Sequence, residues 1–134
     1  MKYLGIDYGD KRVGIAVSDP EGKIAFPKST LFNNPRLIEN LKRLIKEEKI
    51  SKIVVGLPLT LDKSETEQSG KTRVFAKNLK NAVNITVDFE NEMLTTRLVE
   101  RAGIKKERID ESSAALILQS CLDKTLDKRL TTKD

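Results

Sequence analysis

The chain of 134 residues contains no histidine and a single cysteine, and both facts limit the catalytic mechanisms and metal sites that it can form. Without histidine, Ser-His-Asp and Cys-His catalysis are excluded, as are His-ligated zinc sites. Cys121 alone can form neither an internal disulfide nor a thiolate metal cage, and it suits a reducing compartment. If the protein is an enzyme, we expect its catalytic groups to be carboxylates and hard divalent cations, assisted by lysine.

Other signals are also missing. No GxxxxGK[ST] phosphate loop occurs, and no GxGxxG follows an expected strand. No apolar run approaches the roughly 18 residues of a membrane helix. Lys2 and the carboxylate at position 7 leave no room for a signal-peptide core. We therefore expect a soluble, cytoplasmic protein with no membrane partner.

The composition predicts one compact domain with a modest core. Hydrophobic residues make up 38% of the chain and charged residues 34%. We expect the domain to span residues 1–128, with a loose C-terminal tail at 129–134. The net charge of +5 weakly favours a polyanionic partner.

Asp7 is the most informative residue in the chain. It follows the apolar run Tyr3–Ile6, and a turn with glycine, aspartate and lysine separates it from a second apolar run at 13–17. This pattern predicts a β-hairpin. A carboxylate near the end of the first strand is costly unless a cation or hydrogen-bond donors hold it. The alternative is an aspartate at the strand rim that bonds the backbone of the turn.

The rest of the chain predicts a mixed α/β sheet. An edge strand at 24–31, which contains Pro27, should extend the hairpin, and the run at 53–56 should be a strand covered on both faces. Helical periodicity at 65–81 predicts a helix that buries Val74, Phe75 and Leu79. The remaining expected elements are a helix at 35–49, a strand at 83–89 and helices at 94–102 and 110–126. An antiparallel meander followed by parallel strands and crossover helices gives one sheet with helices on both faces.

Sites in such sheets form at the carboxyl ends of parallel strands, so partners of Asp7 should follow the other strands. Glu92 comes just after the expected strand at 83–89. Asp110 begins the last expected helix, on the same face as its apolar stripe, whereas Glu111 points about 100° away. The alternatives are a solvated acid at a helix start for Glu92 and an N-cap for Asp110.

Three carboxylates from distant parts of a chain converge only if something compensates their repulsion. A divalent cation does so with oxygen ligands, and two such ions about 3.5–4 Å apart clamp a phosphodiester for in-line attack by water. The sequence therefore predicts metal-dependent phosphodiester hydrolysis, which requires no histidine.

Four stretches carry a family resemblance over nearly the whole chain. They are GIDYGDKRVGIAVSDPEGKIAFP, IVVGLPLTLDKSETEQSGKTRVFAKNL, ENEMLTTRLVE and IDESSAALILQSCLD. In these motifs the chain resembles the YqgF/RuvX family, RNase-H-like proteins described as Holliday-junction-resolvase-like and as pre-16S rRNA nucleases. The resemblance implies an RNase-H-like, mixed five-stranded sheet in the order 3-2-1-4-5, with strand 2 antiparallel. It also implies a Mg²⁺ or Mn²⁺ site formed by Asp7, Glu92 and Asp110, and processing of the 5′ end of 16S rRNA precursors.

Basic residues near this site are candidates for phosphate contacts. Lys11 and Arg12 match the KR pair of the family in the first turn, and their alternative is an ordinary exposed turn pair. Lys105, Lys106 and Arg108 precede the last expected helix and are placed to meet a phosphate backbone.

The chain departs from the family where Asp-Glu-Arg is common before LTT. Here the sequence reads Asn91-Glu92-Met93, so the central acid remains but its charged neighbours do not. Methionine cannot replace an arginine held over phosphate, and Glu90 becomes a candidate substitute ligand.

Two other functions stay open at this point. A resolvase of branched DNA would use the same metal chemistry and would normally be a symmetric dimer. A non-catalytic RNA- or ribosome-binding module with a vestigial acidic pocket is suggested by Asn91 and Met93. A nucleotide-binding ATPase with a similar sheet fits less well, because this length leaves no room for a second lobe.

Overall fold

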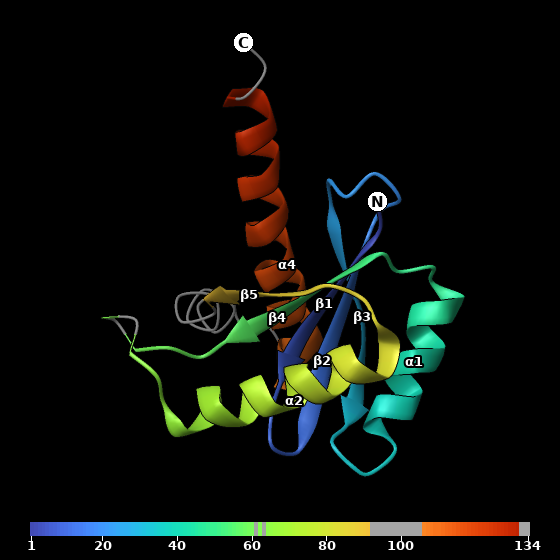
Figure 1. The fold of residues 1–134 in the computed structure, drawn as a ribbon, viewed down its shortest axis with the longest axis vertical. Coiled ribbons are helices and arrows are strands. Elements are labelled where there is room, and N and C mark those ends of the chain that lie inside the picture. Colours follow the sequence, from blue (N-terminus) through green and yellow to red (C-terminus); the bar gives the residue numbers. More distant parts are fainter. Residues whose placement is uncertain (61, 63, 92–105, 132–134) are drawn as a thin grey trace.

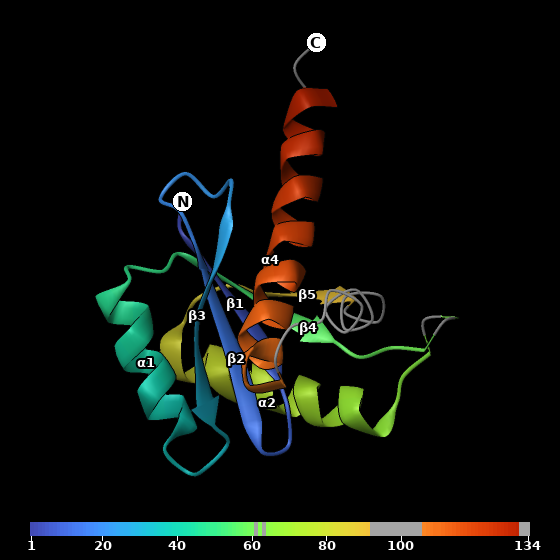
Figure 2. The same ribbon diagram turned by 180° about the vertical axis from the view of Figure 1, so that it is seen from behind.

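The computed structural model describes residues 1–60, 62, 64–91 and 106–131. Within them, five strands form one sheet in the order β3-β2-β1-β4-β5, in which β2 is antiparallel to β1 and β3, and β4 is parallel to β1 and β5. The elements are β1 (Tyr3–Tyr8), β2 (Arg12–Ser18), β3 (Ala25–Phe32), α1 (Leu37–Glu47), β4 (Lys52–Leu57), α2 (Glu67–Val83), β5 (Val87–Asn91) and α4 (Lys106–Thr131). Helices α1 and α2 cover one face of the sheet and α4 covers the other (Figures 1 and 2). The predicted RNase-H-like sheet order is confirmed.

The predicted hairpin of β1 and β2 is also confirmed. Its strands pair from Leu4 and Val17 to Tyr8 and Val13. A Cβ on Gly9 would lie 2.6 Å from the carbonyl oxygen of Arg12, so the tight turn requires glycine there.

Strand β3 lies at the edge of the sheet, as Pro27 predicts. Its pairing with β2 shifts register between Ile15 and Ala16, next to this proline. In the turn before β3, the Asp19 carboxylate accepts hydrogen bonds from the backbone N–H groups of Lys23 at 2.7 Å and Ile24 at 2.9 Å. These bonds, that from Ile24 first, lower the pKa of Asp19 below its usual value.

The larger core lies between the sheet and helices α1 and α2. Helix α1 buries Leu37, Leu41 and Ile45, which recur at intervals of four residues along one stripe. Helix α2 begins with a capping box, in which Thr66 and Ser69 each accept a hydrogen bond from the other's backbone N–H. All of β4 except its first residue is buried, which confirms a strand covered on both faces.

Helix α4 packs directly on the middle of the sheet. A Cβ on Gly5 would lie 2.8 Å from the Cβ of Leu118 and 3.0 Å from the carbonyl oxygen of Ala114. The absence of a side chain at Gly5 therefore allows the helix to approach β1 this closely. Leu122 is the last buried residue among the described side chains of α4, and beyond it the helix projects past the sheet (Figures 1 and 2).

Several expected boundaries are wrong. Helix α2 continues to Val83, so the last strand begins at Val87 and not at residue 83. Helix α4 begins at Lys106, four residues before the expected start, and its backbone is helical to Thr131. Val74, expected in the core, is 61% exposed. The helix expected at 94–102 lies outside the described residues, and no helix among those described is long and apolar enough to cross a membrane.

Candidate functional site

Asp7 is the penultimate residue of β1 and is half-buried. Side chains alternate along a strand, and Tyr3 and Gly5 both face α4. Asp7 has the same parity, so its carboxylate lies on the α4 face, at the carboxyl end of β1. This is the edge of the sheet at which the sequence predicts a site.

Glycines flank Asp7 on both neighbouring strands. Gly14 of β2 pairs with Asp7, and on β4 Gly56 lies one position beyond Val55, the partner of Ile6. Neither glycine places a side chain beside the carboxylate. The two neighbouring strands therefore add no side chain next to Asp7 on the α4 face of the sheet.

Strand β5 places a second carboxylate in line with Asp7 and Gly56, in the same row of residues across the sheet. Glu90 of β5 pairs in register with Gly56 and is only 8% exposed. Lys124 of α4 forms an ion pair with it, from a side chain that is 64% exposed. The sequence placed Glu90 after the strand as a candidate substitute ligand; it lies inside the strand, with a lysine bound to it.

A second ion pair and the cysteine lie beside this one. Lys52 and Asp88 are 2.8 Å apart, and this hydrogen bond raises the pKa of Lys52. Cys121 of α4 is half-buried, and burial raises the pKa of its thiol. The raised pKa disfavours the thiolate, so this cysteine is a poor metal ligand.

The backbone of α4 brings Asp110 toward the same edge. Gln119 of α4 accepts a hydrogen bond from the backbone of Ala25, at the start of β3, whereas Ala114 and Leu118 contact Gly5 further along the sheet. Earlier residues of α4 therefore lie progressively nearer the carboxyl end of β1. Since α4 begins at Lys106, Asp110 is not its N-cap, and that alternative is wrong.

The other predicted site residues are described only in part. Lys11 is exposed in the turn directly after the end of β1, and Arg12 is exposed as the first residue of β2. Lys106 and Arg108 lie in the first turns of α4, where the backbone is described and the side chains are not. Glu92 follows the last residue of β5, and both it and Lys105 lie outside the described residues. Among the described residues, no group of three acidic or cysteine side chains is arranged to hold a metal ion.

Two hydroxyl groups near this row were not identified from the sequence. Thr30 of β3 pairs with Gly14, and its Oγ1 is buried without a hydrogen-bond partner among the described residues. The hydroxyl of Ser113, next to Ala114 on α4, is likewise buried with no partner in the described part of the chain, and this residue is 1% exposed. Buried polar atoms without partners are uncommon and mark places where a ligand or water can bind. No sequence pattern distinguishes these hydroxyls from ordinary ones.

The family model described as "RuvX: Holliday junction resolvase" matches residues 1–124. This chain belongs to the RuvX family. A relative from Sulfurihydrogenibium sp. (strain YO3AOP1), named "Putative pre-16S rRNA nuclease", is 45% identical over 131 residues, which cover 92% of this chain and 90% of the relative. A protein of the same name from Thermoanaerobacter pseudethanolicus is 37% identical over 139 residues, covering 96% of this chain and 100% of the relative. The family resemblance of the sequence is thereby confirmed.

Solved structures confirm the fold of this RuvX-family chain at low sequence identity. T. thermophilus RuvC in complex with a Holliday junction substrate matches with a TM-score of 0.63 and 14% identity, over 95% of this chain and 96% of that one. The Fowlpox virus resolvase, in complex with Holliday junction DNA, matches with a TM-score of 0.60 and 11% identity, over 94% and 99% of the two chains. At these identities the likeness concerns the fold alone.

Proposed function

We propose that this RuvX-family chain is a metal-dependent nuclease that hydrolyses phosphodiester bonds in RNA, in the processing of the 5′ end of 16S rRNA precursors. The observation that carries the proposal is the setting of Asp7. Its carboxylate lies at the carboxyl end of the central strand, between two glycines and near two exposed basic residues, Lys11 in the hairpin turn and Arg12 at the start of β2.

The chemistry of the residues fits a hard divalent cation. Asp7 offers carboxylate oxygens as ligands, and the chain has no histidine and only a half-buried cysteine to favour a softer metal. Asp7, Glu92 and Asp110 are the proposed ligands of Mg²⁺ or Mn²⁺. A bound cation of this kind would supply positive charge that favours attack of water on the phosphorus atom.

The protein's own basic residues would hold the nucleic acid. Lys11, Arg12, Lys105, Lys106 and Arg108 are proposed to contact phosphate groups, which positions the strand without reading its sequence. Such contacts weaken as salt concentration rises, because binding releases the counterions of the phosphates.

RNA is the favoured substrate because the relatives that match most of this chain are named as pre-16S rRNA nucleases. Branched DNA is the second candidate, favoured by the family description and by the resolvases that share the fold. The ion pair between Lys124 and Glu90 favours a third candidate, a binding module without catalysis, because it reduces the negative charge available to a metal.

A nuclease assay tests the proposal with three substrates: RNA carrying the 5′ extension of 16S rRNA, an unrelated RNA and a four-way DNA junction. Each is incubated with Mg²⁺, Mn²⁺ or EDTA. The Asp7→Asn variant should lose cleavage while it keeps the fold and RNA binding. Asp123→Asn is the matched control, because it makes the same chemical change at an exposed residue of α4 that is not part of the proposed site, and it should cleave like the wild type.

Cleavage in EDTA, or equal cleavage by Asp7→Asn and the wild type, would contradict a metal site at Asp7. Cleavage of the junction alone would select the resolvase. RNA binding without cleavage of any substrate would select the binding module.

A further inference from the structure

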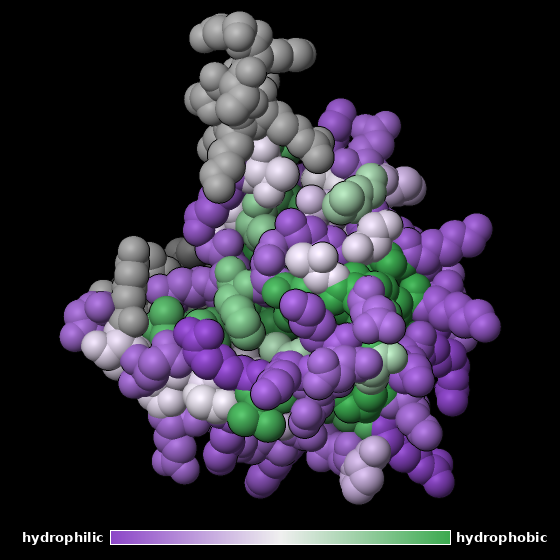
Figure 3. All heavy atoms as spheres, viewed as in Figure 1, coloured by the Kyte–Doolittle hydropathy of each residue, from purple (hydrophilic) through white to green (hydrophobic). Residues whose placement is uncertain are grey.

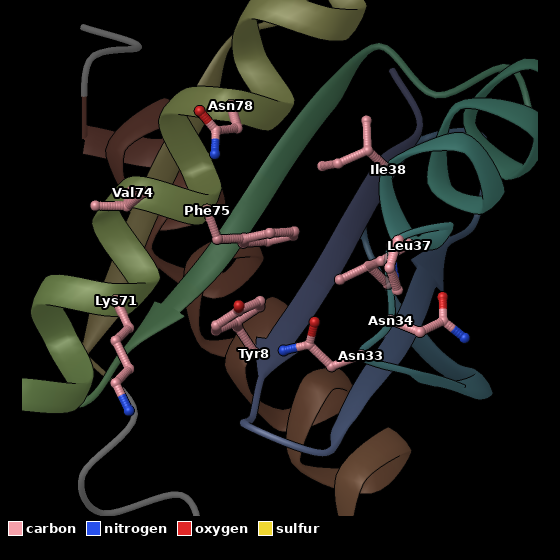
Figure 4. Close-up of a pocket in the computed structure, with 10 residues that line it drawn as sticks. Tyr8, Asn33, Asn34, Leu37, Ile38, Lys71, Val74, Phe75 and Asn78 are labelled. Atoms are coloured by element: carbon pink, nitrogen blue, oxygen red, sulfur yellow. The ribbon is translucent and has the colours of Figure 1, made fainter.

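A second concave site lies on the opposite face of the sheet from Asp7. It is a cavity of about 430 Å³ between α1 and α2, at the end of β1. Figure 4 shows the side chains that line it on α1, α2, β1 and the loop between β3 and α1. Hydrophobic surface is visible between the two helices, with hydrophilic side chains around it (Figure 3).

The walls of the cavity combine apolar and amide groups. The rings of Tyr8 and Phe75 stack with centroids 4.3 Å apart, and Val74 forms part of the α2 wall with 61% of its surface exposed. The amide side chains of Asn33 and Asn34 come from the loop, and that of Asn78 from α2 (Figure 4). Pockets that bind small planar ligands have this composition, with apolar walls and a few placed polar groups.

The amides are positioned by the backbone and keep some hydrogen-bonding capacity. Asn33 donates through Nδ2 to the carbonyl of Gly9 at 2.7 Å, which leaves its Oδ1 as an acceptor. Asn34 accepts through Oδ1 from the N–H of Arg36 at 2.9 Å, which fixes the loop at the rim of the cavity. Asn78 lines the cavity from α2 with an exposed amide, so together with Asn33 the cavity offers both a donor and an acceptor, as the edge of a nucleobase requires.

The cavity opens at the same edge of the sheet as the Asp7 site. Tyr8 directly follows Asp7, so their Cα atoms are about 3.8 Å apart, and alternation along the strand directs their side chains to opposite faces. The loop after β3 reaches this edge too, because β3 runs parallel to β1 and the backbone N–H of Asn33 bonds to the carbonyl of Lys11. A strand crossing the edge at Asp7 can therefore place a neighbouring nucleotide over the cavity.

Lys71 adds positive charge at the mouth. Its ammonium group lies 3.5 Å from the Asp10 carboxylate, and both side chains are at least half exposed. Such a surface ion pair is weak and exchanges readily for other partners. The Lys71 ammonium group could therefore contact the phosphate next to a base bound in the cavity.

We propose that this cavity binds one unpaired nucleobase of the RNA strand that reaches the Asp7 site. The proposal rests on the proposed function, since it takes RNA as the substrate. An unpaired base suits the cavity because it presents an apolar face to the aromatic wall and a polar edge to the amides. A base within a duplex has that edge already paired, so the cavity selects single-stranded RNA.

Binding measured without cleavage tests the cavity separately from catalysis. Fluorescence anisotropy in EDTA reports the affinity for a labelled, unstructured, uridine-rich RNA. Asn78→Ala and Asn81→Ala form a matched pair, because both residues are exposed on α2 and only Asn78 lines the cavity. Val74→Asp is paired with Asn81→Asp, which adds the same charge outside the cavity. All three sites are exposed, so the four variants should keep the fold, and circular dichroism checks it.

We expect Asn78→Ala to weaken binding about threefold to tenfold and Val74→Asp about tenfold or more, with both Asn81 variants like the wild type. A series of RNAs, each with one abasic position, tests the same point from the side of the ligand. One RNA of the series should bind the wild type about tenfold more weakly than the intact RNA does. The same RNA should bind Val74→Asp as tightly as the intact RNA binds this variant, because the cavity no longer holds a base.

Equal affinities of Asn78→Ala and Asn81→Ala, together with an abasic series without effect, would overturn the proposal. Loss of affinity for duplex RNA in Val74→Asp, to the same extent as for single strands, would also overturn it. If the wild type cleaves no substrate yet the pairs still differ in binding, the nuclease proposal fails and the base site stands.

Discussion

Replacing Gly5 with alanine should separate α4 from the sheet. The new Cβ would lie 2.8 Å from the Cβ of Leu118 and 3.0 Å from the carbonyl oxygen of Ala114. Neither atom is the far end of a flexible side chain, so the helix backbone must move. Overpacking of this kind costs about 1–3 kcal/mol. For a domain of this size, a loss of about 2 kcal/mol lowers Tm by roughly 5–10 °C.

Gly70→Ala is the matched control for this change. Gly70 is exposed in α2, and a Cβ there would meet no atom within 4 Å. Alanine in a helix is favoured over glycine by about 0.5–1 kcal/mol, so Gly70→Ala should raise Tm by a few degrees. The same substitution is thus expected to act in opposite directions at the two sites.

Thermal unfolding followed by circular dichroism, with urea unfolding at 25 °C, measures both effects. A Gly5→Ala protein as stable as the wild type would refute the close packing of α4 on β1. The nuclease assay adds a second readout, because α4 also carries Asp110, and a shifted helix should lower cleavage at temperatures where the variant is still folded.

Three further predictions concern stability. Ser113→Ala removes a buried hydroxyl without a partner, so the free energy of unfolding should stay equal or rise by up to about 1 kcal/mol in urea titrations; a clear loss would mean that the hydroxyl is bonded. Lys124→Met leaves the buried Glu90 carboxylate without its cation and should cost about 1–2 kcal/mol, most of which a second change, Glu90→Gln, should restore. The lowered pKa of Asp19 stabilises the fold above the unfolded pKa of about 3.9, so Asp19→Asn should be less stable than the wild type at pH 7. That difference should shrink as the pH falls through the native pKa, and a constant difference between pH 7 and pH 2 would contradict it.

The sequence predicted the sheet well because strands with alternating or continuous apolar residues carry strong local signals. The hairpin around Asp7 and the buried strand β4 both follow from such runs. The antiparallel meander and crossover helices then restrict the topology to few alternatives.

The ends of the helices and strands were harder to predict, because the sequence patterns there fit two kinds of structure. Val83 and Ile85 suggested a strand, but α2 continues until Asn84 adopts a left-handed conformation and ends it. The charged residues before Asp110 suggested a loop, although lysine, glutamate and arginine are good helix formers, and α4 begins at Lys106. Val74 lies on a helical stripe, yet the cavity between α1 and α2 leaves it uncovered.

The candidate site was predictable only where single residues stood out. Asp7 was identified because a carboxylate inside an apolar run is unusual. The glycines beside it, Gly14 and Gly56, acquire meaning only from strand register, which brings residues far apart in the chain together. The ion pair of Glu90 with Lys124 likewise depends on how α4 lies across the sheet.

The direction of α4 makes the end of this helix at Thr131 a convenient handle. The helix leads away from the carboxyl end of β1 and extends beyond the sheet (Figures 1 and 2). A dye or a surface tether attached there would stand well apart from Asp7 and from the cavity beside Tyr8. Immobilised protein would then present its nucleic-acid side to solution, which suits single-molecule observation of strands arriving and leaving.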